Sequence, residues 1–102
     1  MIRLSAKNID LAINEKCGAV ESLKLFGNEA LADKLSLFTM RFRNLNGGAI
    51  RAESLDAKSV IFGEGVAEFS RFGGVLDGVC VKIYFCSTGE EIRWGAEVGG
   101  VP

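Results

Sequence analysis

The chain has 102 residues, 48% hydrophobic and 25% charged, a composition typical of one globular domain and not of a disordered segment. With 12 basic and 13 acidic residues, its formal net charge is −1. Its lysines are scattered singly, which argues against nucleic acid or an anionic membrane surface as a partner. No apolar run approaches the ~18 residues of a membrane span. The first residues lack the apolar segment of a secretory signal, so cytoplasm and a compartment reached after signal removal both stay open.

Cysteine and histidine usage excludes several kinds of site. The chain has three cysteines, Cys17, Cys80 and Cys86, and no histidine. Cys80 and Cys86 fall in one predicted strand, which would put their Cα atoms about 20 Å apart, beyond the ~7 Å reach of a disulfide. We therefore expect buried, reduced thiols and no metal site or cofactor.

The N-terminal part of the chain predicts a short edge strand at residues 2–5 and then an antiparallel hairpin. Ile9, Leu11 and Ile13 lie on one face of the first hairpin strand, and a turn follows at residues 14–18. The second strand begins at Val20 and closes on the sequence Phe-Gly-Asn-Glu. Period-two alternation with turn residues between the runs is the pattern of such a hairpin.

The next stretch contains two competing periodicities. Leu31, Leu35 and Phe38 recur at helical spacing, whereas residues 37–43 alternate at period two. We expect a strand at residues 37–43 and, at residues 30–35, a connector that forms at most one or two helical turns.

The rest of the chain predicts short strands separated by glycine-rich turns. A tight turn is expected at residues 44–48, Asn-Leu-Asn-Gly-Gly, because Asn and Gly accept positive φ at little cost. We place the strands that follow at residues 49–53, 59–62, 66–72, 79–86 and 91–98.

The last two predicted strands alternate most clearly. In the first, the residues expected to face the core are Val79, Val81, Ile83 and Phe85, and those expected on the other face are Cys80, Lys82, Tyr84 and Cys86. In the second, the residues expected to point inward are Ile92, Trp94, Ala96 and Val98.

Short strands with many glycines and a single proline predict an all-β fold. We expect one domain over residues 1–102, an antiparallel β-sandwich of about seven to nine strands. Its predicted core consists of Leu11, Ile13, Leu23, Phe38, Met40, Phe42, Val81, Ile83, Phe85, Ile92 and Trp94.

The order of features in residues 9–29 resembles the opening of galactose-mutarotase-like sandwich domains: an apolar strand, Gly-Ala, a polar gap, Leu, and then Gly-x-Glu. Such domains stand at the N-terminus of many large carbohydrate-active enzymes, glycoside hydrolases among them. The resemblance implies an accessory module that packs on the catalytic domain of a larger protein and contacts glycan. Residues 98–102, Val-Gly-Gly-Val-Pro, are typical of a link, so we expect an N-terminal module excised from a longer chain.

The same residues favour a non-catalytic role. Without histidine, Ser-His-Asp and Cys-His arrangements are excluded. Aldose epimerases of the resembled family rely on a histidine acid and a glutamate base, and neither motif is present. Two alternatives stay open: a small stand-alone sugar epimerase or mutarotase-like enzyme, and a purely structural, oligomerising β domain.

Four side chains are candidates for ligand binding. Aromatic rings stack on the C–H faces of sugars, which makes Tyr84 and Trp94 candidates, although core packing is the competing role for Trp94. Arg41 and Arg43, on the outer face of their strand, could bind hydroxyl groups or pair with acids across the sheet. Because an uncovered sheet edge tends to find a partner, we also expect a homodimer through the face of Tyr84 or the edge of Trp94.

Overall fold

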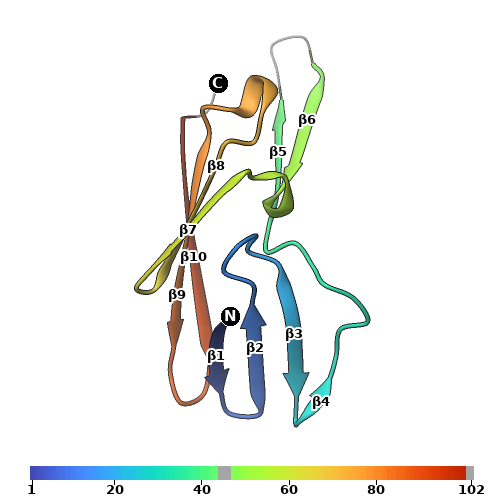
Figure 1. Ribbon diagram of the computed structural model, residues 1–102, viewed down its shortest axis with the longest axis vertical. Helices are drawn as coiled ribbons and strands as arrows, with labels where there is room; N and C mark the ends of the chain where they lie inside the picture. Colours follow the sequence, from blue (N-terminus) through green and yellow to red (C-terminus); the bar gives the residue numbers. More distant parts are fainter. Residues whose placement is uncertain (44–46, 101–102) are drawn as a thin grey trace.

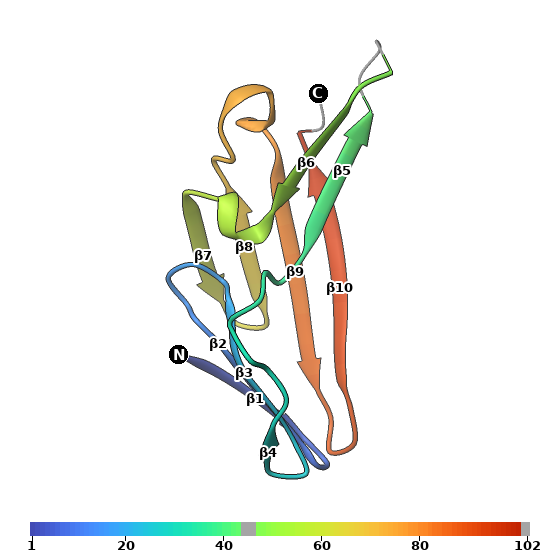
Figure 2. The same ribbon diagram turned by 90° about the vertical axis from the view of Figure 1, so that its right-hand side faces the viewer.

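The computed structural model describes residues 1–43 and 47–100, and it is all-β, as the sequence predicts (Figures 1 and 2). In this part of the chain, ten antiparallel strands form three sheets, and the helical segments are two single 3-10 turns, η1 (Ser54–Asp56) and η2 (Gly74–Leu76). This is one strand more than the predicted number of about seven to nine, and the additional strand is the two-residue β4. The turn expected at residues 44–48 falls largely on residues 44–46, outside the described residues. Within the described ranges, no helix has the length and hydropathy needed to cross a membrane.

The first sheet contains the predicted hairpin. Its order is β1-β2-β3-β4, with the bounds Ile2–Ala6, Ile9–Ile13, Val20–Leu25 and Asn28–Glu29. Leu11 pairs with Leu23 across β2 and β3. The turn between them is closed by the Asn14 N–H, which donates to the Ala19 carbonyl at 2.8 Å.

The second sheet has the order β10-β9-β8-β7 and contains the two strands with the clearest alternation. The strand bounds are Ser59–Gly63 for β7, Val66–Ser70 for β8, Cys80–Ser87 for β9 and Ile92–Gly99 for β10. In β9, Val81 and Ile83 are buried and Tyr84 is exposed, which confirms the predicted faces of this strand.

A two-stranded hairpin completes the fold. It consists of β5 (Thr39–Arg43) and β6 (Ala49–Glu53), at the end of the molecule opposite β4 (Figure 1). The strand expected from residue 37 therefore begins at Thr39. The connector before it forms no helix and makes one isolated bridge, between Val20 and Leu35.

The core consists of two clusters of buried side chains on the same face of the second sheet. The larger joins the hairpin to β8 and β9 and comprises Met40, Ala52, Ala67, Phe69, Leu76, Val79, Val81 and Ile83. The smaller lies under the first sheet and comprises Leu11, Ile13 and Val20. The clusters are continuous because the half-buried Leu37, Phe62 and Phe85 contact both.

Most of the predicted core is confirmed, with one error. The fully buried members are Leu11, Ile13, Met40, Val81 and Ile83, and those half-buried against the clusters are Leu23, Phe38, Phe42, Phe85 and Ile92. Trp94 was expected inside and is 45% exposed. The reason is its position on β10, the edge strand of its sheet, where the predicted inward side also leaves Ala96 and Val98 exposed. The sequence pattern also missed Phe69, which is completely buried.

All three cysteines are free thiols, as expected, but their burial differs from the prediction. Cys17 and Cys80 are half-buried, and Cys86 is exposed near the end of β9. Cys86 lies on the solvent side of that strand, where no second layer covers it, so the expectation of a buried thiol is wrong there.

Candidate functional site

The four ligand-binding candidates do not converge on one site. Tyr84 lies on the outer face of β9, whereas Trp94 lies on the opposite face of the same sheet, across from Phe85. Arg41 and Arg43 are exposed on β5, in the separate hairpin. The four side chains therefore lie on separate surfaces of the molecule.

Tyr84 belongs to a polar group on the outer face of the second sheet. Its hydroxyl donates to the Glu97 carboxylate at 3.0 Å, and this bond raises the pKa of Tyr84. The Cys80 thiol donates to Glu68 at 3.2 Å, and burial, followed by this bond, raises the pKa of Cys80. Lys82 lies between Glu68 and Glu97 in one row across three strands. Raised pKa values keep the phenol and the thiol protonated, so neither is activated as a nucleophile.

Arg41 and Arg43 have no acid directly opposite them. Arg41 faces Arg51 across the hairpin, and Arg43 faces Ala49. The acid nearest in this register, Glu53, forms its ion pair with Arg51, at 3.3 Å. Among the described residues the predicted cross-strand pairing with acids is therefore not found, because Arg41 faces a like charge and Arg43 faces an uncharged residue.

Trp94 covers the half-buried Phe85 without being covered itself. The two rings meet edge to face, with centroids 5.0 Å apart and an interplanar angle of 75°. Beside the indole lies a shallow apolar hollow of about 230 Å³, whose lining also includes Leu37 and Ile83. The larger core cluster thus reaches the surface along β10.

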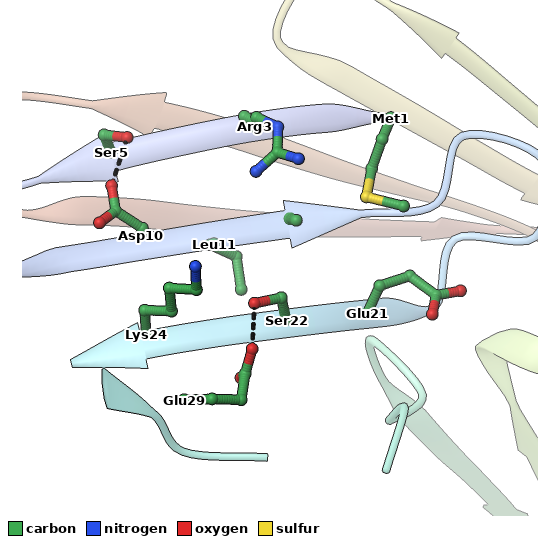
Figure 3. A pocket seen from close by; sticks show the side chains of 10 residues that line it. Met1, Arg3, Ser5, Asp10, Leu11, Glu21, Ser22, Lys24 and Glu29 are labelled. Atoms are coloured by element: carbon green, nitrogen blue, oxygen red, sulfur yellow. Dashed lines mark hydrogen bonds between the residues drawn. The ribbon is translucent and has the colours of Figure 1, made fainter. Parts of the chain in front are cut away.

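A larger hollow, of about 530 Å³, lies on the outer face of the first sheet (Figure 3). We call it the polar hollow. It is lined by Met1, Arg3, Ser5, Asp10, Leu11, Ala12, Glu21, Ser22, Lys24 and Glu29. Alternation at period two explains most of this set, because it sends Arg3, Ser5, Asp10, Ser22 and Lys24 to the face opposite the core.

Hydrogen bonds hold two carboxylates of the polar hollow in place. Glu29 accepts the hydroxyl hydrogen of Ser22 and the backbone N–H of Leu23, the latter at 2.9 Å. These bonds, that of Ser22 first, lower the pKa of Glu29 and keep it ionised. Asp10 accepts from the Ser5 hydroxyl at 2.8 Å.

The polar hollow was missed by reasoning from sequence, although a signal was present. Arg3 and Ser5 alternate with apolar neighbours in one segment, and Ser22 and Lys24 alternate in another. Each pattern predicts a solvated strand face. Only the pairing of the strands in β1-β2-β3-β4 brings the four side chains to one surface.

In the described part of the chain, no group of three or more Cys, Asp or Glu side chains is arranged to hold a metal ion. Comparison of the chain with protein-family models, curated proteins and solved structures found no match.

Proposed function

We propose that this chain is a non-catalytic β-sandwich accessory module, similar to galactose-mutarotase-like N-terminal domains. In this proposal it packs on the catalytic domain of a carbohydrate-active protein through the core-side face of β10. We call this surface, formed by Trp94, Ala96 and Val98 with Leu37 beside them, the β10 face. The proposal rests on one observation. The apolar residues of β10 that point to the core side of the sheet are exposed to solvent.

Alternation in β10 is maintained even though its residues after Ile92 are exposed. Trp94 and Val98 lie opposite Phe85 and Val81, residues of the core side of β9, yet they are 45% and 44% exposed. A solvated strand usually carries polar residues on such a face, and contiguous exposed apolar side chains mark interaction sites. The pattern favours a face that a partner covers.

The accessible surface area of the molecule also supports a face that a partner covers. Its accessible surface is 6622 Å² for 10.9 kDa. A compact monomer of that mass exposes about 5,600 Å², so the excess is about 1,000 Å². A standard interface buries about 800 Å² on each partner, so the excess matches one half of such an interface.

The backbone of β10 adds a second attraction for a partner. β10 pairs with β9 and is the last strand of its sheet. A long edge strand offers backbone donors and acceptors to a neighbouring chain. A partner domain at the β10 face could therefore bury the apolar side chains and also extend the sheet.

The non-catalytic part of the proposal rests on the carboxylates. Glu68 and Glu97 lie on opposite sides of Lys82, and each already accepts a hydrogen bond from a neighbouring side chain. In the polar hollow, Asp10 and Glu29 are separated in the same way by Lys24, and each accepts from a serine hydroxyl. A stand-alone epimerase or glycosidase needs an acid and a base that converge on substrate. Turnover of aryl-glycosides or faster anomer exchange by the pure chain, abolished by one Asp or Glu substitution, would contradict the proposal.

The test of the β10 face is self-association, because in the isolated chain a second copy can take the place of the partner domain. We expect analytical ultracentrifugation at about 100 µM to show a reversible dimer, an affinity within the range of transient interfaces. The double substitution Trp94→Lys and Val98→Lys should leave a folded monomer. A matched control is Ile61→Lys, which changes a side chain 63% exposed on β7, at the other edge of the sheet, and should leave the dimer intact.

Two outcomes would contradict the proposal. One is a wild-type chain that stays monomeric throughout the concentration range. The other is a dimer that survives the double substitution at the β10 face but is lost with Ile61→Lys.

A further inference from the structure

The polar hollow is built from two rows of side chains that cross the first sheet. In the register of the strands, Arg3, Ala12 and Ser22 form one row. The second row, which also crosses β4, consists of Ser5, Asp10, Lys24 and Glu29. Because neighbouring strands lie about 4.8 Å apart, each row presents polar groups at a regular spacing along a concave surface.

The cations of the polar hollow come from the two strands that flank β2, with Arg3 opposite Ala12 and Lys24 opposite Asp10. Arg3 and Lys24 extend toward β2 from the strands that flank it (Figure 3). Ala12, which lies opposite Arg3 and Ser22, contributes only a methyl group to the lining. Neither cation forms an ion pair with another residue of the described ranges, so both keep donors for a ligand.

The carboxylates supply the matching acceptors. Asp10 and Glu29 are each oriented by a serine hydroxyl of the same surface. A carboxylate has about four acceptor positions, so each retains some for a ligand. The acceptors are thus positioned before a ligand arrives, which reduces the entropy lost on binding.

The lining carries charges of both signs, the cations Arg3 and Lys24 and the carboxylates Asp10, Glu21 and Glu29. A strongly anionic or cationic ligand would meet like charges at close range, whereas a neutral ligand rich in hydroxyl groups can donate to the carboxylates and accept from Arg3 and Lys24. The volume of about 530 Å³ lies within the range of about 300–1,000 Å³ usual for small-molecule sites.

We propose that the polar hollow is a binding site for a neutral, polyhydroxylated ligand, a short segment of a sugar chain. The lining contains no aromatic ring, so recognition rests on hydrogen bonds that compete with water, and affinity is weak. This proposal deepens the proposed accessory function by giving the module a ligand. It does not depend on the β10 face, so either proposal can fail without the other.

The test is a nuclear magnetic resonance titration of the full chain with neutral trisaccharides. The probes are gluco-, manno-, galacto- and xylo-configured trisaccharides, each raised to about 10 mM, because a weak site has a dissociation constant near 1 mM. We expect at least one probe to shift the amide signals of Ser5, Asp10, Ser22 and Lys24 in a saturable way. The double substitution Arg3→Ala and Lys24→Ala should weaken that binding at least tenfold.

The control is Lys58→Ala, which removes a lysine charge from an exposed position outside the polar hollow and should leave the affinity unchanged. Unperturbed amide spectra of all three proteins away from the substituted residues establish that they are folded. The proposal is overturned if no neutral trisaccharide shifts these amides, or if the shifts persist in the double variant. It is also overturned if only trigalacturonate or inorganic phosphate binds, since the site would then select anions.

Discussion

Gly18 occupies the point where the first hairpin meets the second sheet. Its φ of +72° lies in the left-handed region, as a turn residue requires. A Cβ atom at this position would clash with Cε1 of Phe69, a ring that is completely buried. The sequence indicates the turn, but not the ring that closes over it.

Gly18→Ala should therefore destabilise the fold for two reasons. The left-handed backbone costs an alanine about 1 kcal/mol, and displacing the Phe69 ring adds about 1–3 kcal/mol, so we expect the free energy of unfolding to fall by about 2–4 kcal/mol. Urea denaturation followed by circular dichroism measures the change.

The control for this prediction is Gly27→Ala. Gly27 has a φ of +81°, but a Cβ there would meet nothing within 4 Å. The free energy of unfolding of this variant should fall only by the cost of the left-handed backbone, about 1 kcal/mol. Equal losses in the two variants would show that contact with Phe69 contributes nothing.

The β5–β6 hairpin is attached to the connector that precedes it by one buried polar side chain. Ser54, which follows β6, is completely buried. Its hydroxyl oxygen accepts the Leu37 N–H at 2.7 Å, and its own N–H donates to the Phe38 carbonyl at 3.0 Å. Leu37 also contacts both core clusters, so this bond positions a residue that joins them.

Ser54→Ala should leave the Leu37 N–H without its partner. An unsatisfied buried donor costs about 1–3 kcal/mol, and we expect that loss in the free energy of unfolding. The Leu37 amide should also exchange its hydrogen faster in native-state measurements. Ser59→Ala in β7, where the side chain is half-buried, is the comparison and should change stability by less than about 0.5 kcal/mol. An unchanged exchange rate at Leu37 would contradict the proposed role of the hydroxyl.

The molecule as a whole is elongated, with extents of 47 × 28 × 21 Å. Its radius of gyration is 14.8 Å, against about 13 Å for a compact domain of this length. The rings of Phe62 and Phe85, both in the second sheet, stack with centroids 6.4 Å apart and also pack against the core side chains of the first sheet. At the end near β4, the Lys7 N–H donates to the Gly89 carbonyl at 3.0 Å.

Because both core clusters share Phe62 and Phe85, we expect the chain to unfold as one cooperative unit. Thermal unfolding followed by Trp94 fluorescence, which reports on the second sheet, should coincide with that followed by far-ultraviolet circular dichroism. Phe85→Ala should reduce the free energy of unfolding by about 2–3 kcal/mol, less than truncation of a fully buried phenylalanine. Two separate transitions in the wild type would show that the parts of the fold around the two core clusters unfold independently.

Local pattern was sufficient for most of the strands. Alternation in β2, β9 and β10, together with the turn residues before Val20, placed these elements close to their observed bounds. It missed β4, because two residues carry no periodicity. At residues 30–35 it left the form of the connector open, because an apolar spacing typical of a helix occurs there in an irregular segment. Such short segments take their conformation from the layers they join.

The sequence alone determined the all-β class, the order of the main strands and the sharing of faces within each strand. Tertiary structure decided which of those faces is covered. Ile83 and Trp94 follow the same alternation on adjacent strands, yet one is buried under the hairpin and the other is exposed at the edge. The polar hollow likewise required four strands in register. Alternation reports only to which side of its own strand a residue points, whereas burial and binding depend on what lies opposite that side.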